Sequence, residues 1–344
     1  ELDPIEKNAE KQRENPACMI GLGYNEQTPY YKLLNANYYR APIISLGTSR
    51  VMQFKGVCFY GGFYNCGGAV VSNYDEYRNF LENLTYSPRC VIIGLDAWVF
   101  NGAWNQTVSA LNEGQVVKID REPAALLGAI ARDWLEQKWS FADLSNYPQH
   151  IGFNGRVKGE GFMYDGSYYH GAVYRVPSSS ADYGFADTLR RISRGVSRFE
   201  WGEDIDPDTV AQLDGLLAYC AGRGIHVVGF LPPFAPSICE AMQQSGHYGY
   251  LGKIPPVCRR LFEQYGFEFY DYLDVSGLGM TDGCFLDGFH GSEVVYARIL
   301  EDMAGQGSEI GLYLDRGHTR ELLENAYSGF VFEKPERAAG QGEG

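Results

Sequence analysis

Short runs of consecutive apolar residues recur along the chain and predict buried strands. They lack the alternation of apolar and polar positions that a half-exposed strand shows, so we assign them to a parallel sheet covered on both faces. A fifth run, residues 56–64, contains more glycine and is less regular. The four regular runs are residues 42–46, 90–95, 225–231 and 267–272.

Helical patterns separate these runs. Ser72 or Asn73 is suited to cap a helix whose apolar positions fall on one face, and Asp206 followed by Pro207 marks the start of a second helix that should end near Gly222. A third pattern covers residues 122–137, with Pro123 in its first turn. Strands that alternate with helices of this length predict an α/β fold with helices on both faces of a parallel sheet.

The alternation is interrupted by a long insertion after the predicted strand at residues 90–95. We predict an N-terminal extension over residues 1–40, a single α/β domain over residues 41–334 with an insertion at about residues 102–200, and a flexible tail over residues 335–344. Residues 151–171 of the insertion are rich in glycine and tyrosine. Long segments of this kind inside a domain are usually functional, and their aromatic content argues against disorder.

Composition narrows the classes of partner. The 344 residues carry a formal net charge of −14, which argues against binding to nucleic acid or to an anionic lipid surface, since both require a basic face. No stretch approaches the ~18 consecutive apolar residues of a membrane span. The eight cysteines include no C-x-x-C pair and are too sparse for a disulfide scaffold. Their even number permits disulfides without requiring them.

The first candidate for chemistry is the segment Gly47-Thr48-Ser49-Arg50, directly after the first predicted strand. The carboxyl end of a parallel strand is where open α/β sheets bind ligands. Ser49 placed there is a candidate nucleophile if an imidazole lies within hydrogen-bond reach, and its own N–H is a candidate oxyanion donor. The alternative is an ordinary strand-to-helix turn in which Ser49 or Thr48 caps the helix.

The second candidate is the segment Asp287-Gly288-Phe289-His290, which precedes an amphipathic helical run. An Asp three residues before a His can orient the imidazole, which then accepts the proton of a serine hydroxyl. One alternative is a capping Asp beside an exposed His. Another is a metal site formed by Asp282, Asp287 and His290, which would need further ligands to complete its shell.

Taken together, the strand ending in G-x-S-R and the D-x-x-H segment before a terminal helix resemble the SGNH/GDSL hydrolase superfamily, over roughly residues 41–100 and 220–305. The resemblance implies a three-layer α/β/α sandwich, with Ser49 as nucleophile, His290 as general base and Asp287 as its orienting carboxylate. The phrase around His290 and the long insertion are most similar to the cell-envelope branch, which includes alginate O-acetylation and teichoic-acid D-alanylation proteins. That branch works beside membrane-bound O-acyltransferases.

The resemblance also implies oxyanion donors after the second and third strands. Gly67 or Gly68 fits the first of these blocks, with Ser49 supplying its own N–H. In the second block Asp96 stands where the family usually has asparagine, and an ionised carboxylate cannot donate to an oxyanion. Three alternatives follow: Asp96 is protonated, Asn101 takes the role, or Asp96 contacts a substrate hydroxyl.

The insertion is the candidate binding site for the acyl acceptor. Tyrosines with interleaved polar groups suit sugar rings, although a packed hairpin with ordinary surface charges has the same composition. The residues that we predict to contact substrate are Arg50, Asp96, Tyr164, Asp165, Tyr168, Tyr169 and His170.

The sequence thus predicts a serine-dependent acyl-ester hydrolase or O-acyltransferase that acts on an acylated carbohydrate or cell-envelope polymer through an acyl-enzyme, without metal or cofactor. The alternative is a catalytically weak or inactive SGNH-like envelope protein that binds a polysaccharide or a membrane acyltransferase. Because of the resemblance, and because the sequence starts at Glu1 rather than Met, we expect an extracytoplasmic protein with an N-terminal anchor or signal.

Overall fold

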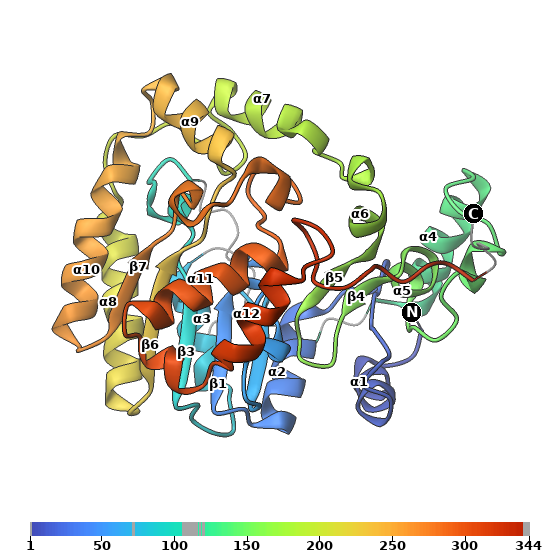
Figure 1. Cartoon of the computed structure of the whole chain (residues 1–344). Helices are drawn as coiled ribbons and strands as arrows, with labels where there is room; N and C mark the ends of the chain where they lie inside the picture. Colours follow the sequence, from blue (N-terminus) through green and yellow to red (C-terminus); the bar gives the residue numbers. More distant parts are fainter. Residues whose placement is uncertain (1, 71–72, 105–115, 117, 119–120, 340–344) are drawn as a thin grey trace.

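The fold is organised around a five-stranded parallel sheet, seen here in a computed structural model that describes residues 2–339 except 71–72, 105–115, 117 and 119–120 (Figure 1). The strand order is β2-β1-β3-β6-β7, and every pairing is parallel. Every residue of the first three strands is buried, which explains why they appear in the sequence as apolar runs. The strands are β1 (Ile43–Gly47), β2 (Phe63–Gly67), β3 (Cys90–Gly94), β6 (His226–Leu231) and β7 (Glu268–Asp271).

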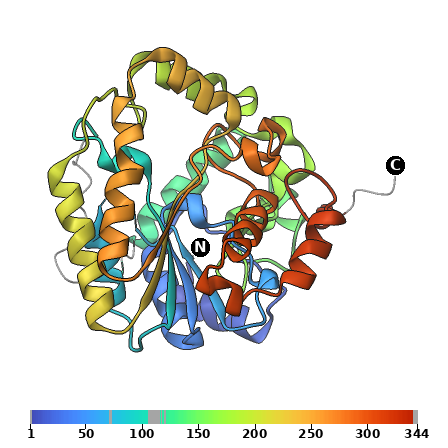
Figure 2. The ribbon, with the colours of Figure 1, turned by 60° about the vertical axis from the view of Figure 1, so that its left-hand side comes forward.

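Helices cover both faces of this sheet, so the predicted α/β fold with three layers is confirmed. Figure 2 shows α8 and α10 on one side of the strands and α11 and α12 on the other. Helix α3 packs against α8 in the first of these layers. The bounds of these helices are α3 (Tyr74–Glu82), α8 (Pro207–Gly222), α10 (Ile254–Gln264), α11 (Glu293–Gly305) and α12 (Arg316–Glu324).

Local sequence signals set most element boundaries. The Asn73 side chain accepts a hydrogen bond from the N–H of Glu76 and caps α3, and the Asp206 side chain caps α8 by accepting from the N–H of Asp208. The predicted strand over residues 56–64 is shifted: its first part is a 3₁₀ turn, Gly56–Cys58, and β2 begins only at Phe63. That turn starts at Gly56, whose N–H donates a hydrogen bond to the carboxylate of Asp165 in the insertion.

The N-terminal extension and the insertion pack together beside the sheet, to the right in Figure 1. They share a small apolar core separate from the main one, formed by Ile5, Ala9, Ile20, Leu22, Tyr31 and Phe162. The elements involved are α1 (Ile5–Glu14), α2 (Thr28–Tyr39), α4 (Pro123–Leu135), α5 (Phe153–Lys158), the hairpin β4 (Glu160–Phe162) and β5 (Tyr168–His170), and α6 (Gly171–Arg175).

The rest of the insertion crosses the sheet edge. Helix α7 (Ala186–Arg194) lies beside α9 (Pro236–Ser245) at the top of Figure 1. The final described residues run back along the insertion, where the N–H of Ala339 donates to the carbonyl of Asn146 at 2.7 Å. The predicted tail is thus in contact with the protein as far as it is described.

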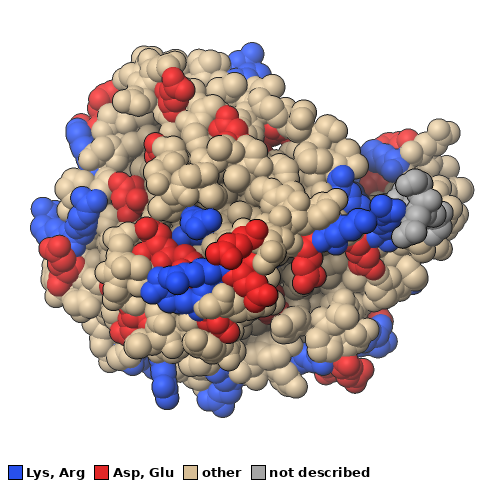
Figure 3. Space-filling model, in the orientation of Figure 1, with Lys and Arg blue, Asp and Glu red and all other residues tan. Residues whose placement is uncertain are grey.

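The surface carries charges of both signs. On the face seen in Figure 3, lysine and arginine side chains are interspersed with aspartate and glutamate. Within the described residues, no helix is long and apolar enough to cross a membrane. All eight cysteines are unpaired.

Candidate active site

Ser49 lies where β1 leaves the sheet and turns into a 3₁₀ helix, Ser49–Val51. Thr48 caps that turn, because its hydroxyl oxygen accepts from the N–H of Arg50. Gly47 is needed for the close return of the chain, since a Cβ atom there would lie 2.9 Å from the Val51 side chain. The turn leaves Ser49 partly exposed at the carboxyl edge of the sheet.

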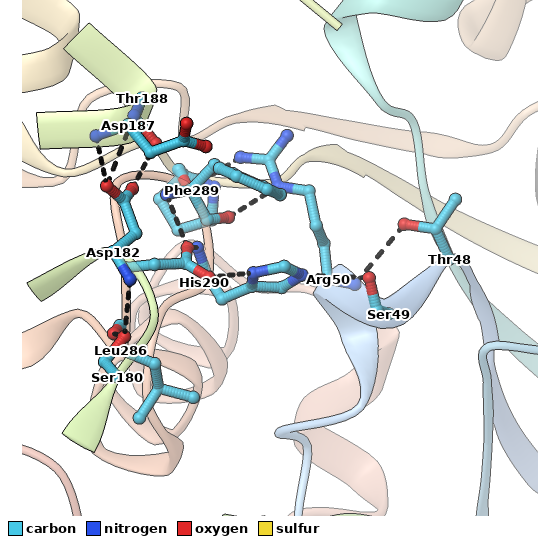
Figure 4. Close-up of polar contacts among 12 residues, drawn as sticks. Thr48, Ser49, Arg50, Ser180, Asp182, Asp187, Thr188, Leu286, Phe289 and His290 are labelled. Carbon is cyan, nitrogen blue, oxygen red and sulfur yellow. Dashed lines mark hydrogen bonds and ion pairs between the residues drawn. The ribbon is translucent and has the colours of Figure 1, made fainter. Parts of the chain in front are cut away.

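The structure brings His290 to Ser49 across 241 positions of sequence, with His290 Nε2 2.9 Å from Ser49 Oγ (Figure 4). On the other side of the ring, His290 Nδ1 lies 2.7 Å from Asp287 Oδ2. When Nδ1 donates to the carboxylate, Nε2 carries the lone pair that can accept the serine proton. The three residues therefore form a continuous Ser–His–Asp chain of hydrogen bonds.

The Asp287 carboxylate is fixed by its own loop. Its Oδ1 accepts from the N–H of Phe289 at 2.9 Å and of His290 at 2.8 Å. Burial alone would raise the pKa of Asp287, but the imidazole of His290 and these two N–H donors outweigh burial and lower the pKa to about 2. Asp287 is therefore ionised at any pH near neutrality and can stabilise an imidazolium at His290.

A buried ion pair ties together the loops that hold these groups. Arg50 Nη1 lies 3.2 Å from Asp96 Oδ1, while Asp96 Oδ2 accepts from the hydroxyl of Thr48 at 2.7 Å. The remaining donors of Arg50 reach the carbonyls of Phe289, Pro232 and Pro233 at 2.6–2.9 Å. One guanidinium thus joins the loops that follow β1, β3 and β6 to the loop that carries His290. Its contact with the carbonyl of Phe289 is drawn in Figure 4.

These contacts correct the expectation that Arg50 and Asp96 contact substrate. Each residue is only 1% exposed, and every polar group named above is engaged with protein atoms. Burial of an unpaired charge is costly, so the two side chains are held together rather than presented to a ligand. Asp96 thus contacts the two residues on either side of Ser49, namely Thr48 and Arg50.

The oxyanion donors predicted from the glycine block are also engaged. The N–H of Gly67 donates to Asn65 Oδ1 at 2.7 Å, and the N–H of Gly68 is shared between the carbonyls of Gly47 and Thr48 at 2.8 and 3.0 Å. In this arrangement neither amide is free to donate to a substrate. The cause lies in the tertiary structure. Asn65 Nδ2 donates to the carbonyls of Val51 and Phe54 in the loop that follows Ser49, and this orientation of the side chain places its Oδ1 beside the N–H of Gly67.

Asn101 is engaged in the same way. Its Nδ2 donates to the carbonyl of Glu200 at 2.6 Å, and its Oδ1 accepts from the N–H of Ala103. Asn101 therefore fastens the insertion to the loop after β3. Of the four predicted donors, the N–H of Ser49 is the one that has no acceptor among the described residues.

Part of the insertion contacts the loop that carries His290 and holds it in place. Ser180 Oγ donates to the carbonyl of Leu286 at 2.8 Å, and Asp182 accepts from the N–H groups of Asp187 and Thr188 at the start of α7 (Figure 4). Thr188 in turn packs so closely on Gly288 that a Cβ atom at that glycine would lie 2.6 Å away. The insertion thereby fixes the segment between Asp287 and His290.

The tyrosine-rich residues of the insertion divide into two groups. Tyr164, Asp165 and Tyr169 line a cavity of about 350 Å³, together with the buried pair Lys55 and Glu293. Ser49 and His290 do not line this cavity. Asp165 also has a structural task, because its carboxylate accepts from the N–H groups of Gly56 and Ser167.

The other two predicted residues, Tyr168 and His170, are half-buried in the hairpin. The Tyr168 ring lies edge-on to Phe162 with 5.1 Å between centroids, as expected for a packed hairpin. His170 is half-buried, and its desolvation, with smaller electrostatic effects of His290 and Lys55, lowers the pKa of His170 to about 3. His170 therefore stays neutral within electrostatic range of the Ser–His–Asp chain.

No cluster of three or more His, Cys, Asp or Glu side chains suited to a metal ion occurs among the described residues. Asp282, which belonged to the metal alternative, accepts from the N–H of Ser237 at 3.0 Å.

Sequence reasoning missed two groups beside the site. One is the bridging role of Arg50, for which the sequence offered only proximity to Ser49. The other is Arg198, whose guanidinium carbon lies 5.5 Å from the ring centroid of Trp98 and 5.9 Å from that of Phe289. No local motif marks Arg198, because it comes from the insertion and reaches the site only in the folded chain.

No protein-family model, curated protein or solved structure matches this chain. The resemblance to the SGNH/GDSL superfamily therefore stays a prediction that rests on the motifs around Ser49 and His290.

Proposed function

We propose that this protein is a serine-dependent acyl-ester hydrolase or O-acyltransferase. The observation that carries the proposal is the hydrogen-bond chain from Ser49 through His290 to Asp287, with separations of 2.9 and 2.7 Å. Such a chain is the arrangement that activates a serine hydroxyl, and here it lies at the carboxyl edge of a parallel sheet, where ligands bind in folds of this class.

In the proposed reaction, Ser49 Oγ attacks the carbonyl carbon of an ester while His290 Nε2 takes the hydroxyl proton. His290 then gives that proton to the departing alcohol, which leaves an acyl group on Ser49. A second hydroxyl, from water or from a sugar, loses its proton to His290 and accepts the acyl group. The ionised Asp287 stabilises the imidazolium in both halves of the cycle.

The substrate class that we propose is an acylated carbohydrate or cell-envelope polymer, at an extracytoplasmic location. Support comes from the motif resemblance and from the tyrosines of the insertion, of which Tyr164 and Tyr169 line the cavity described above. A membrane-bound O-acyltransferase is the proposed partner on the same grounds.

The alternative proposal is a catalytically weak or inactive envelope protein that binds a polysaccharide or such a partner. The engaged amides of Gly67 and Gly68 favour it, because only the N–H of Ser49 is left among the predicted donors. Loss of one oxyanion donor typically lowers kcat by about 10²–10³.

Labelling with a fluorophosphonate tests the two against each other, because the probe reacts with an activated serine. We expect one adduct by intact mass on the wild type and none on Ser49→Ala. Ser276→Ala, which removes an exposed serine, is the matched control and should label like the wild type. Absence of an adduct on folded wild-type protein would favour the binding protein, whereas an adduct on Ser49→Ala would refute Ser49 as the nucleophile.

A further inference from the structure

Arg198 is a cation at the rim of the candidate active site, and the described residues provide no ion-pair partner for it. Its guanidinium lies against the Phe289 ring, and that ring lies 4.4 Å from the imidazole of His290, centroid to centroid. It also lies against Trp98, in the 3₁₀ turn after β3. Phe289 and Trp98 contact each other, so Arg198 covers a joint surface of the His290 loop and the loop after β3.

In the described part of the chain, the side chain of Arg198 forms no ion pair and no hydrogen bond. The carboxylate of Glu200 accepts from the backbone N–H of Arg198 at 3.3 Å but forms no ion pair with the guanidinium. Arg191, on α7, also lies against Phe289, with 6.0 Å from its guanidinium carbon to the ring centroid, but it is paired with Asp187. Arg198 is partly exposed, so a ligand can reach it.

The backbone at this point is held in an uncommon conformation. Ser197 and Arg198 have φ angles of 56° and 78°, a region that favours glycine. Neighbouring contacts hold the turn in place: Phe199 is buried against Phe289 and Phe234, and its carbonyl accepts from the hydroxyl of Tyr248 at 2.9 Å. Two consecutive side-chain-bearing residues in this region are disfavoured, and such strain gathers at functional positions.

From these observations we infer that Arg198 binds an anionic group of the substrate, a carboxylate or a phosphate, close to the ester that Ser49 attacks. Guanidinium groups recognise both anions through paired hydrogen bonds, and a guanidinium stacked on aromatic rings keeps its N–H edge free to do so. In a chain with a net charge of −14, an arginine against the Phe289 ring, which itself contacts His290, also offsets the repulsion that an acidic substrate meets. The inference rests on the proposed function and narrows it to acidic esters.

A pair of substrates that differ in charge tests this inference, namely phenyl acetate and 3-carboxyphenyl acetate. The measured quantity is kcat/KM for the acidic ester divided by kcat/KM for the neutral ester. A substitution that affects the reaction of both esters equally leaves this ratio unchanged. We expect Arg198→Met to lower the acidic-to-neutral ratio about 10- to 100-fold, as for loss of one charge-assisted contact, and Arg198→Lys to lower it less. Arg194→Met, which removes an exposed arginine from the last turn of α7, should leave the ratio unchanged.

Two results would overturn the inference. An unchanged ratio in Arg198→Met would show that Arg198 does not meet the substrate anion. An equal loss for both esters would assign Arg198 to the oxyanion or to packing, since neither role distinguishes the two substrates.

A binding experiment separates this inference from the proposed function. Calorimetric titration of Ser49→Ala with D-glucuronate, D-glucose 1-phosphate and D-glucose requires no turnover, and it distinguishes a carboxylate from a phosphate. We expect at least one acid to bind more tightly than glucose, and that preference to disappear when Arg198→Met is added. If this preference appears while the wild type fails to react with fluorophosphonate, the proposed function fails and the anion site stands. If neither acid shows a preference that depends on Arg198, the anion site fails.

Discussion

Asp96→Asn is the substitution on which the motif resemblance and the structure make opposite predictions. The SGNH pattern has asparagine at this position as an oxyanion donor, so the resemblance predicts a gain of roughly 10²–10³ in rate for restoring one donor. In the structure, however, the carboxylate points to the hydroxyl of Thr48 and the guanidinium of Arg50, at 2.7 and 3.2 Å. The structure therefore predicts a loss.

The size of the loss follows from burial. Both partners of the Arg50–Asp96 pair are almost fully buried, and removing one partner of such a pair typically costs about 3–5 kcal/mol. The amide oxygen of asparagine can still accept one of the two hydrogen bonds, so we place the cost at the lower end, about 3 kcal/mol. This corresponds to roughly a hundredfold fall in the ratio of folded to unfolded protein.

Urea unfolding of Asp96→Asn measures the free energy of unfolding, and fluorophosphonate labelling measures the reactivity of Ser49. We expect the free energy to fall by about 3 kcal/mol and labelling to slow, because the loop that carries Ser49 loses its anchor. Asp75→Asn, at an exposed aspartate on α3, is the control and should change little. A stability loss below about 1 kcal/mol, or faster labelling, would refute this interpretation of Asp96.

Three further predictions concern the His290 loop and the far edge of the sheet. Asp287→Asn should lower kcat for an aryl acetate by about 10⁴, because the amide favours the wrong imidazole tautomer, while the free energy of unfolding changes far less than the rate. Gly288→Ala should slow labelling by at least tenfold, because the new methyl group would lie 2.6 Å from Thr188 and displace the loop. His226, whose Nε2 lies 2.8 Å from Glu268, has its pKa raised by that hydrogen bond. The protonated His226 therefore stabilises the fold fully at pH values below its ordinary pKa of 6.5, and this stabilisation is lost as the pH rises through the raised pKa. In His226→Gln the free energy of unfolding, measured in urea, should depend less on pH over this range.

Each of these has a control or a result that would contradict it. Gly277→Ala adds a methyl group where no atom lies within 4 Å, so it should label at the wild-type rate. Full turnover in Asp287→Asn would remove Asp287 from the mechanism. A wild-type pH dependence in His226→Gln would assign the effect to other groups, among them Glu309, which lies 3.5 Å from the other ring nitrogen of His226.

The parts of the fold that sequence reasoning predicted well are those with local causes. Buried parallel strands are continuous apolar runs, so four strands were located to within a residue or two. The helix caps at Asn73 and Asp206 bond to N–H groups two or three residues away, so they too could be predicted from the sequence. The contact between Asp287 and His290 also lies within a single loop, so the motif alone indicated it.

The parts that could not be predicted depend on distant partners. Whether the N–H of Gly67 is free depends on the position of the Asn65 side chain, and the pairing of Arg50 with Asp96 spans 46 positions. Arg198 reaches Phe289 only because the insertion folds back over the sheet edge. A sequence shows which groups exist, but which of them neutralise each other is decided by the tertiary structure.

The shared core of the N-terminal extension and the insertion has a consequence for the order in which a newly made chain folds. Gln12 donates to the carbonyl of Phe162, 150 positions later, and Ile20 exchanges backbone hydrogen bonds with the same residue. Residues 1–40 therefore leave the ribosome long before their partners exist, and their apolar side chains stay uncovered meanwhile. Synthesis of the hairpin that contains Phe162 is the event that ends this exposure. Slow translation between the two segments should therefore increase aggregation of the nascent chain.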